Sequence, residues 1–162
     1  MKVMIIDDEL PTAEGLKRFL EANGLRVEMI VNPRYPEAAK EACSVLRGVH
    51  SEEDAYTALI LDVNYQDHFI GGIKVYTKIL TEGLRGKFRH LIIWTKYYPS
   101  GGTAKSDAYK AVEIFRELAF VPPLNVLPKA TAADHAKILD RIRELADEKN
   151  TPIGTYGMWR FH

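Results

Sequence analysis

The sequence contains one cysteine, Cys43, and no excess of either charge, because its 22 Lys and Arg residues balance 22 Asp and Glu residues. A single cysteine excludes an internal disulfide and a cysteine-rich zinc site. A net charge of zero gives no broad basic field, so we expect no nucleic-acid partner. The sequence also lacks an apolar run long enough to span a membrane and a signal peptide at its start. We therefore expect a cytoplasmic protein that binds no membrane.

At 162 residues the chain is long enough for one domain with a substantial core. It shows no internal repeat, low-complexity tract or boundary between two domains. We predict a domain over residues 1–148 and a C-terminal tail over residues 149–162. The tail is rich in aromatic residues, so it either packs on the domain or anchors a partner protein or a second copy of the chain.

Apolar runs rich in β-branched residues alternate with segments of helical periodicity along the chain. The predicted strands lie at residues 2–7, 25–31, 57–62, 90–95 and 123–127. The predicted helices lie at residues 12–23, 35–47, 72–83, 105–119 and 131–148. This alternation is typical of an α/β fold with helices on both faces of a parallel sheet. We therefore predict a five-stranded, doubly wound parallel sheet with five helices.

Polar residues lie at or just beyond the ends of four of the predicted strands. They are Asp7 and Asp8 at the end of the first strand, Asp62 at the end of the third, Thr95 at the end of the fourth and Lys129 shortly after the fifth. In doubly wound sheets ligands bind at the carboxyl ends of the strands. Two strands that bring carboxylates to this edge form an acidic pocket, and oxygen-rich pockets suit a hard cation such as Mg²⁺.

Four of these five residues also have an ordinary structural interpretation. Asp7 and Asp8 can stabilise the N-terminus of the first helix through its dipole. Thr95 is a β-branched residue of a kind favoured in strands. A lysine such as Lys129, taken alone, is usually a solvated surface residue. The occurrence of all of them in one order, on successive strands, favours a functional site.

With these residues in this order, the sequence resembles the receiver domain of response regulators in two-component signalling, in particular chemotaxis-type single-domain receivers. The resemblance covers about residues 1–148 and implies a flavodoxin-like sheet with strand order 2-1-3-4-5. It implies that Asp62 accepts a phosphoryl group. It also implies that Mg²⁺ is bound by Asp7, Asp8, Asp62 and the backbone carbonyl of Asn64.

The same resemblance gives roles to the other two polar residues. Thr95 matches the switch hydroxyl that turns toward the phosphoryl group, and Lys129 matches the lysine that pairs with that group. Such a protein is a signalling phospho-acceptor rather than an enzyme, although it can phosphorylate itself from a small donor and dephosphorylate itself. The implied partners are a sensor histidine kinase or phosphotransfer protein and an output protein that the sequence does not identify. A homodimer is a further option.

The sequence departs from the receiver pattern at two positions that matter for the switch. Val126 stands where receivers commonly carry an aromatic residue, so the partner of Thr95 is either missing or replaced by a residue such as Tyr97 or Tyr98. Lys96 stands where receivers commonly carry a small residue. Its long side chain either obstructs the phosphoryl pocket or reaches an anion.

Two other functions stay open on the sequence alone. Val126 and Lys96 favour a receiver-like interaction module that needs no phosphorylation. A Mg²⁺-dependent phosphohydrolase would generally need a second acid two residues after its nucleophile, and that position is Asn64. Residues 97–105 form a longer loop than a minimal receiver needs, and we expect a surface loop that contacts an unusual partner or a second copy.

Overall fold

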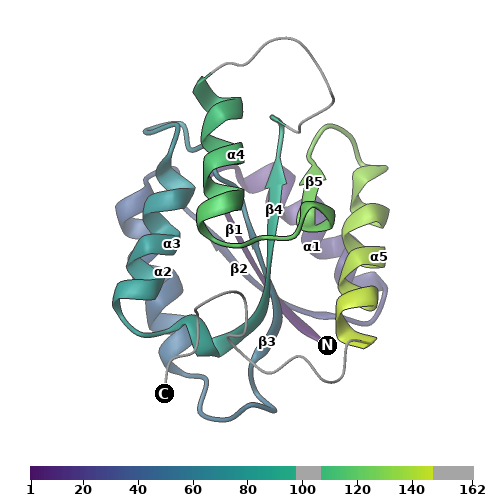
Figure 1. Cartoon of the computed structure of the whole chain (residues 1–162). Coiled ribbons are helices and arrows are strands. Elements are labelled where there is room, and N and C mark those ends of the chain that lie inside the picture. Colours follow the sequence, from purple (N-terminus) through teal and green to yellow (C-terminus); the bar gives the residue numbers. More distant parts are fainter. Residues whose placement is uncertain (98–106, 148–162) are drawn as a thin grey trace.

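The computed structural model describes residues 1–97 and 107–147, which form a sheet flanked by helices (Figure 1). The strands are β1 (Lys2–Asp7), β2 (Arg26–Val31), β3 (Tyr56–Leu61), β4 (Phe88–Thr95) and β5 (Val126–Pro128). The helices are α1 (Leu10–Ala22), α2 (Tyr35–Arg47), α3 (Gly71–Thr81), α4 (Asp107–Leu118) and α5 (Asp134–Asp147). Two 3₁₀ turns, η1 (Arg85–Lys87) and η2 (Pro123–Asn125), precede β4 and β5. The expected loop from residue 98 to 105 and the tail from residue 149 lie outside the described residues.

All five strands are parallel and lie in the order β2-β1-β3-β4-β5. This order confirms the predicted doubly wound fold. Ile6 lies beside Leu61 in the register of β1 and β3, and the Asp62 N–H donates to the Ile6 carbonyl at 3.1 Å. The Lys129 N–H donates to the Thr95 carbonyl at 3.0 Å, which continues the β4–β5 ladder by one residue. The predicted site residues therefore lie at one edge of the sheet.

Alternate residues of each strand face opposite layers of helices. Val3 and Ile5 of β1 belong to a core cluster with α1 and α5. Met4 and Ile6 belong to the cluster with α2, α3 and α4. Figure 1 shows α2 and α3 on one side of the sheet and α5 on the other. Burial of both faces explains why the central strands have continuous apolar sequences.

Prolines account for two of the shifts from the predicted boundaries. The first helix begins at Leu10 rather than residue 12, because Pro11 fits the first turn of a helix, where its missing N–H is not needed. The fifth strand begins at Val126 rather than residue 123. Pro122 and Pro123 cannot donate backbone hydrogen bonds to a ladder, so residues 123–125 form a 3₁₀ turn instead.

The fifth helix begins at Asp134, three residues after the predicted start. The Asp134 carboxylate accepts the backbone N–H groups of Ala130 and Thr131 at 2.8 and 2.9 Å. These bonds fix the turn that leads from Lys129 into the helix. None of the described helices is long and apolar enough to cross a membrane.

Candidate functional site

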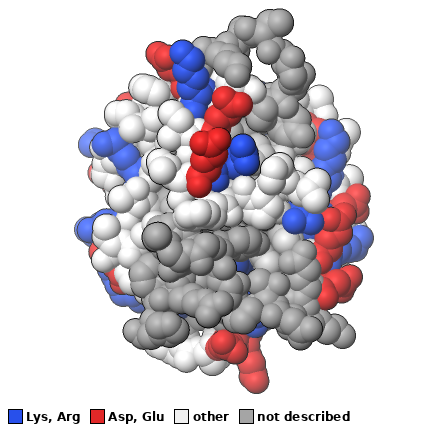
Figure 2. Space-filling model, in the orientation of Figure 1, with Lys and Arg blue, Asp and Glu red and all other residues white. Residues whose placement is uncertain are grey.

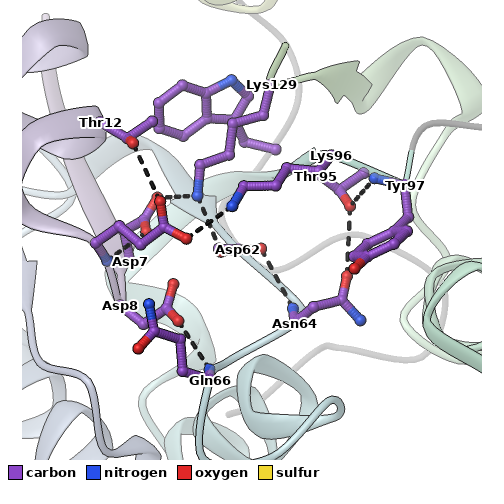
Figure 3. A network of polar contacts seen from close by, with 12 residues as sticks. Asp7, Asp8, Thr12, Asp62, Asn64, Gln66, Thr95, Lys96, Tyr97 and Lys129 are labelled. Carbon is purple, nitrogen blue, oxygen red and sulfur yellow. Dashed lines mark hydrogen bonds and ion pairs between the residues drawn. The ribbon is translucent and has the colours of Figure 1, made fainter.

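Three carboxylates from two adjacent strands meet at the carboxyl edge of the sheet (Figure 3). Asp7 is the last residue of β1, Asp8 follows it, and Asp62 follows β3. The three residues are only 0, 6 and 5% exposed, and one oxygen of each lies within 4.8 Å of the others. Within residues 1–97 and 107–147 no other group of three or more His, Cys, Asp and Glu ligands comes as close together. The structure thus brings together all three acids expected at the metal site.

Lys129 is the cationic partner of this cluster. Its Nζ atom donates to Asp7 Oδ2 at 2.5 Å and to Asp62 Oδ2 at 2.9 Å. The side chain is 1% exposed, and Nζ lies 4.9 Å from the centroid of the Trp94 ring. Burial opposes the charged form of Lys129, but the attraction of Asp62 and Asp7 outweighs it, so the pKa of Lys129 is raised. Lys129 is therefore a buried ammonium group and not a solvated surface lysine.

Backbone N–H groups of the loop after β3 orient two of the carboxylates. Asp8 Oδ2 accepts the N–H of Gln66 at 2.8 Å, and Asp62 Oδ1 accepts the N–H of Asn64 at 3.2 Å. The other oxygen of Asp8, Oδ1, is buried and has no hydrogen-bond partner among the described residues. A buried carboxylate oxygen without a partner is costly, so this atom needs a cation or a donor from outside the described chain.

The charges in the cluster do not balance. Three carboxylates face one buried ammonium group, which leaves an excess of two negative charges when all of them are ionised. Burial, opposed by Lys129 and reinforced by the charge of Asp7, raises the pKa of Asp62 to about 8. Burial is also the main cause that raises the pKa of Asp7. A divalent cation would restore the balance and favour the ionised form of both acids.

The donor set of this cluster fits Mg²⁺. The ligands are hard carboxylate oxygens, Asp8 Oδ1 lacks another partner, and the missing charge equals that of one divalent ion. A hollow of about 180 Å³ lies beside the cluster. Its lining includes Asp8, Asp62, Asn64 and Lys96.

No family model matches the sequence, and no curated protein is significantly similar to it. Solved structures are similar in fold. A response regulator receiver domain protein from Methanospirillum hungatei has a TM-score of 0.58 and 16% identity, with 92% of this chain and 97% of that chain covered. The receiver domain of a Francisella response regulator has a TM-score of 0.56 and 15% identity, with 92% and 98% covered. The signal receiver domain of a modulated diguanylate cyclase from Desulfovibrio desulfuricans has a TM-score of 0.53 and 17% identity, with 91% and 97% covered.

The fold is that of response regulator receiver domains. At identities this low the likeness concerns the fold and not the chemistry of the site.

Thr95 lies at the position expected for the switch hydroxyl. The Thr95 hydroxyl is fully buried, accepts the N–H of Tyr97 at 2.9 Å and donates to Asn64 Oδ1 over a long 3.5 Å. Thr95 thus lies at the edge of the site, held by its own loop.

Val126, at the position where receivers commonly carry an aromatic residue, is part of the hydrophobic core. Val126 is 3% exposed and pairs with Ile93 of β4. Tyr97, one of the two residues expected as a replacement, is 41% exposed. Its backbone N–H donates to the Thr95 hydroxyl, and Tyr97 also lines the hollow beside Asp62. Tyr98, the other expected replacement, lies outside the described residues.

Lys96 reaches an anion at the mouth of the site. Its Nζ atom donates to Glu9 Oε1 at 2.7 Å, and the hydrogen bond lowers the pKa of Glu9 and raises that of Lys96 (Figure 3). Glu9 also accepts the Thr12 hydroxyl at 3.4 Å, and its backbone N–H donates to Asp7 Oδ1 at 2.9 Å. Asp7 therefore also holds the backbone of the residue before α1, although α1 itself has no side-chain cap hydrogen bond. Glu9 was missed in the sequence because its partner lies 87 residues away.

Gly72 is a second residue that sequence reasoning missed. Its N–H donates to the Val63 carbonyl at 2.8 Å. A Cβ atom at this position would lie 2.0 Å from the Asp62 carbonyl oxygen and 2.6 Å from Val63 Cα. Only glycine allows the first turn of α3 to approach the segment that carries Asp62 so closely.

Proposed function

We propose that this protein is a receiver that accepts a phosphoryl group on Asp62 in the presence of Mg²⁺ and transmits the event through a protein contact. The observation that carries the proposal is the contact of Lys129 Nζ with both Asp62 and Asp7 inside one buried cluster. A structural ion pair needs one acid for one lysine. Three buried acids around one lysine, beside a hollow, are better explained by a site that takes up a cation and an anion.

The chemistry requires an ionised Asp62. A carboxylate oxygen of Asp62 forms a bond to the phosphorus atom, and the leaving group departs with the electron pair of the bond that breaks. Mg²⁺, held by Asp7, Asp8, Asp62 and the backbone carbonyl of Asn64, would supply the charge that lets two anions approach. Lys129 keeps Asp62 oriented and provides a fixed positive charge for the transferred oxygens.

Two further residues respond to the new charge in this proposal. The Thr95 hydroxyl is a buried donor at the edge of the site, and it can exchange its long contact with Asn64 for a bond to a phosphoryl oxygen. Lys96 is held by Glu9 through a largely exposed ion pair, which is weak enough to exchange. Rearrangement of the loop after β4 then changes the surface that a partner contacts.

The proposed phosphoryl donor is a sensor histidine kinase or a phosphotransfer protein, and the output is a protein partner. This assignment follows the receiver fold of the structural neighbours. The protein is then a signalling phospho-acceptor rather than an enzyme with turnover. The side chain at the position where a phosphohydrolase would need its second acid is the amide of Asn64, which donates to the Phe69 carbonyl at 2.7 Å.

The test is incubation with acetyl phosphate and Mg²⁺, followed by intact mass measurement. Wild type should gain one phosphoryl group, and Asp62→Ala should gain none. Asp54→Ala removes an exposed acid outside the cluster and should behave as wild type. Excess EDTA should suppress the adduct. An adduct that persists in Asp62→Ala, or its absence from wild type, would contradict the proposal.

Two results would instead support the other functions. Sustained release of phosphate from a phosphomonoester would indicate a phosphohydrolase. A wild type that never accepts phosphate, together with a partner that binds wild type and Asp62→Asn equally, would indicate an interaction module without a phosphorylation switch.

A further inference from the structure

A second hollow, which we call the α2–α3 groove, lies between helices α2 and α3. It encloses about 590 Å³ and shares no lining residue with the hollow beside Asp62. Its apolar lining includes Ala39 and Cys43, which are 6% and 1% exposed. The aromatic residue Tyr35, which is half-buried, also lines it. The groove therefore offers an apolar floor that is within the size range of ligand sites.

The rims of the α2–α3 groove are strongly basic. Lys40 and Arg47 line it from α2, Lys74 and Lys78 line it from α3, and Glu82 is the single acid in the lining. All four basic residues are exposed. Figure 2 shows mainly blue side chains along the left edge of the molecule, where Figure 1 places α2 and α3. The groove thus has an excess of three positive charges in a chain whose net charge is zero.

Only part of this charge is neutralised. Glu82 forms ion pairs with Arg47 and with Lys78, the latter at 3.3 Å. Lys40 and Lys74 have no carboxylate within ion-pair distance in the described ranges, and the Lys74 ammonium lies 5.5 Å from the centroid of the Tyr35 ring. The contacts of Glu82 also show how one carboxylate bridges the two helices. A ligand with further carboxylates can repeat that arrangement at Lys40 and Lys74.

We propose that the α2–α3 groove binds a short acidic segment of a partner protein, with an apolar side chain on Ala39 and Cys43 and carboxylates at Lys40 and Lys74. Seven residues of helix separate Lys40 from Arg47, a rise of about 10 Å. Three residues of extended peptide cover about the same distance. A segment of about five residues is therefore long enough to extend along the groove from Lys40 to Arg47.

The experiment is a titration of the full-length, ¹⁵N-labelled protein with the peptide acetyl-Glu-Glu-Leu-Glu-Glu-amide at low salt, followed by amide chemical shifts. The shifts should map to α2 and α3 and become smaller as salt rises, because the rim contacts are exposed. The double variant Lys40→Glu with Lys74→Glu should bind at least tenfold more weakly. The matched control, Arg18→Glu with Lys110→Glu, changes the net charge equally on α1 and α4 and should bind within about twofold of wild type.

Peptide variants test the chemistry of the ligand. Replacing all four glutamates with glutamine should abolish binding, and replacing the leucine with glycine should weaken it several-fold. The proposal is overturned by shifts outside α2 and α3, by equal binding of the Lys40/Lys74 double variant, or by equal binding of the glutamine peptide. Citrate that binds the groove as tightly as the peptide would indicate a general anion site and would also overturn it. The proposal does not rest on phosphorylation, so Asp62→Ala should bind the peptide like wild type.

Discussion

Replacing Asp62 with asparagine removes one of three buried carboxylates while keeping the shape of the side chain. Burial raises the pKa of Asp62 to about 8, whereas the unfolded chain has the ordinary value of 3.8. Between these values the folded state holds a proton that the unfolded chain has released. The free energy of unfolding of the metal-free wild type therefore receives a contribution from Asp62 that is full below pH 4 and is lost as pH rises toward 8.

The size of the effect follows from this titration. One proton difference changes the free energy of unfolding by up to about 1.4 kcal/mol per pH unit. We therefore subtract the free energy of unfolding of wild type from that of Asp62→Asn. This difference should grow by about 2 to 3 kcal/mol between pH 5.5 and 7.5. Burial also lowers the pKa of His90 to about 4. Because His90 is present in both proteins, its contribution to the free energy of unfolding cancels in the difference between them.

The assay is urea unfolding of both proteins in EDTA at several pH values, with the transition midpoint and slope measured at each. A parallel series with Mg²⁺ should stabilise wild type at pH 7.5, by about 1.4 kcal/mol at ten times the dissociation constant, and should stabilise Asp62→Asn less. A stability difference that does not change with pH, or that shrinks as pH rises, would refute the account of a buried, undercompensated carboxylate cluster.

Three other substitutions test individual parts of the site. Lys129→Ala leaves Asp7 and Asp62 without their buried cation and should lower the free energy of unfolding by about 3 to 5 kcal/mol at neutral pH, measured by urea unfolding; a loss below about 1 kcal/mol would contradict it. Lys96→Ala breaks only the largely exposed ion pair with Glu9, so it should change the free energy of unfolding by less than about 1 kcal/mol. Carboxyl NMR should show that the pKa of Glu9 rises in this variant. Gly72→Ala forces a Cβ against the Asp62 carbonyl and should cost more than about 2 kcal/mol and weaken Mg²⁺ binding in a calorimetric titration; unchanged binding would be the contrary result.

The sequence allowed the edge of the sheet to be predicted because the apolar runs are continuous and end abruptly. The end of each run placed Asp7, Asp62 and Thr95 at strand termini, and the parallel arrangement then brought them to one side. The start of the fifth strand was wrong because an apolar segment was treated as extended although two prolines interrupt it. Lys129 was still placed correctly, since it follows the end of that strand.

The remaining contacts of the site could not be predicted because they depend on how loops fold. Glu9 meets Lys96 across 87 residues, and Asp8 is bound by the backbone of Gln66 rather than by a side chain. Every residue except proline has a backbone N–H group, so residue types do not indicate which N–H will bind a carboxylate. The basic α2–α3 groove is similarly invisible along the chain, because its cations come from two helices and only their packing places them face to face.

The central claim, that Asp62 is the phospho-acceptor, is tested most directly by trapping the acyl phosphate. Protein treated with acetyl phosphate and Mg²⁺ is reduced with borohydride, which converts a phosphorylated aspartate to homoserine, and the peptides are then sequenced by mass spectrometry. We predict homoserine at position 62, dependent on both Mg²⁺ and the phosphodonor. Homoserine at another acid, or none at any position while an authentic receiver is labelled in the same experiment, would contradict the account.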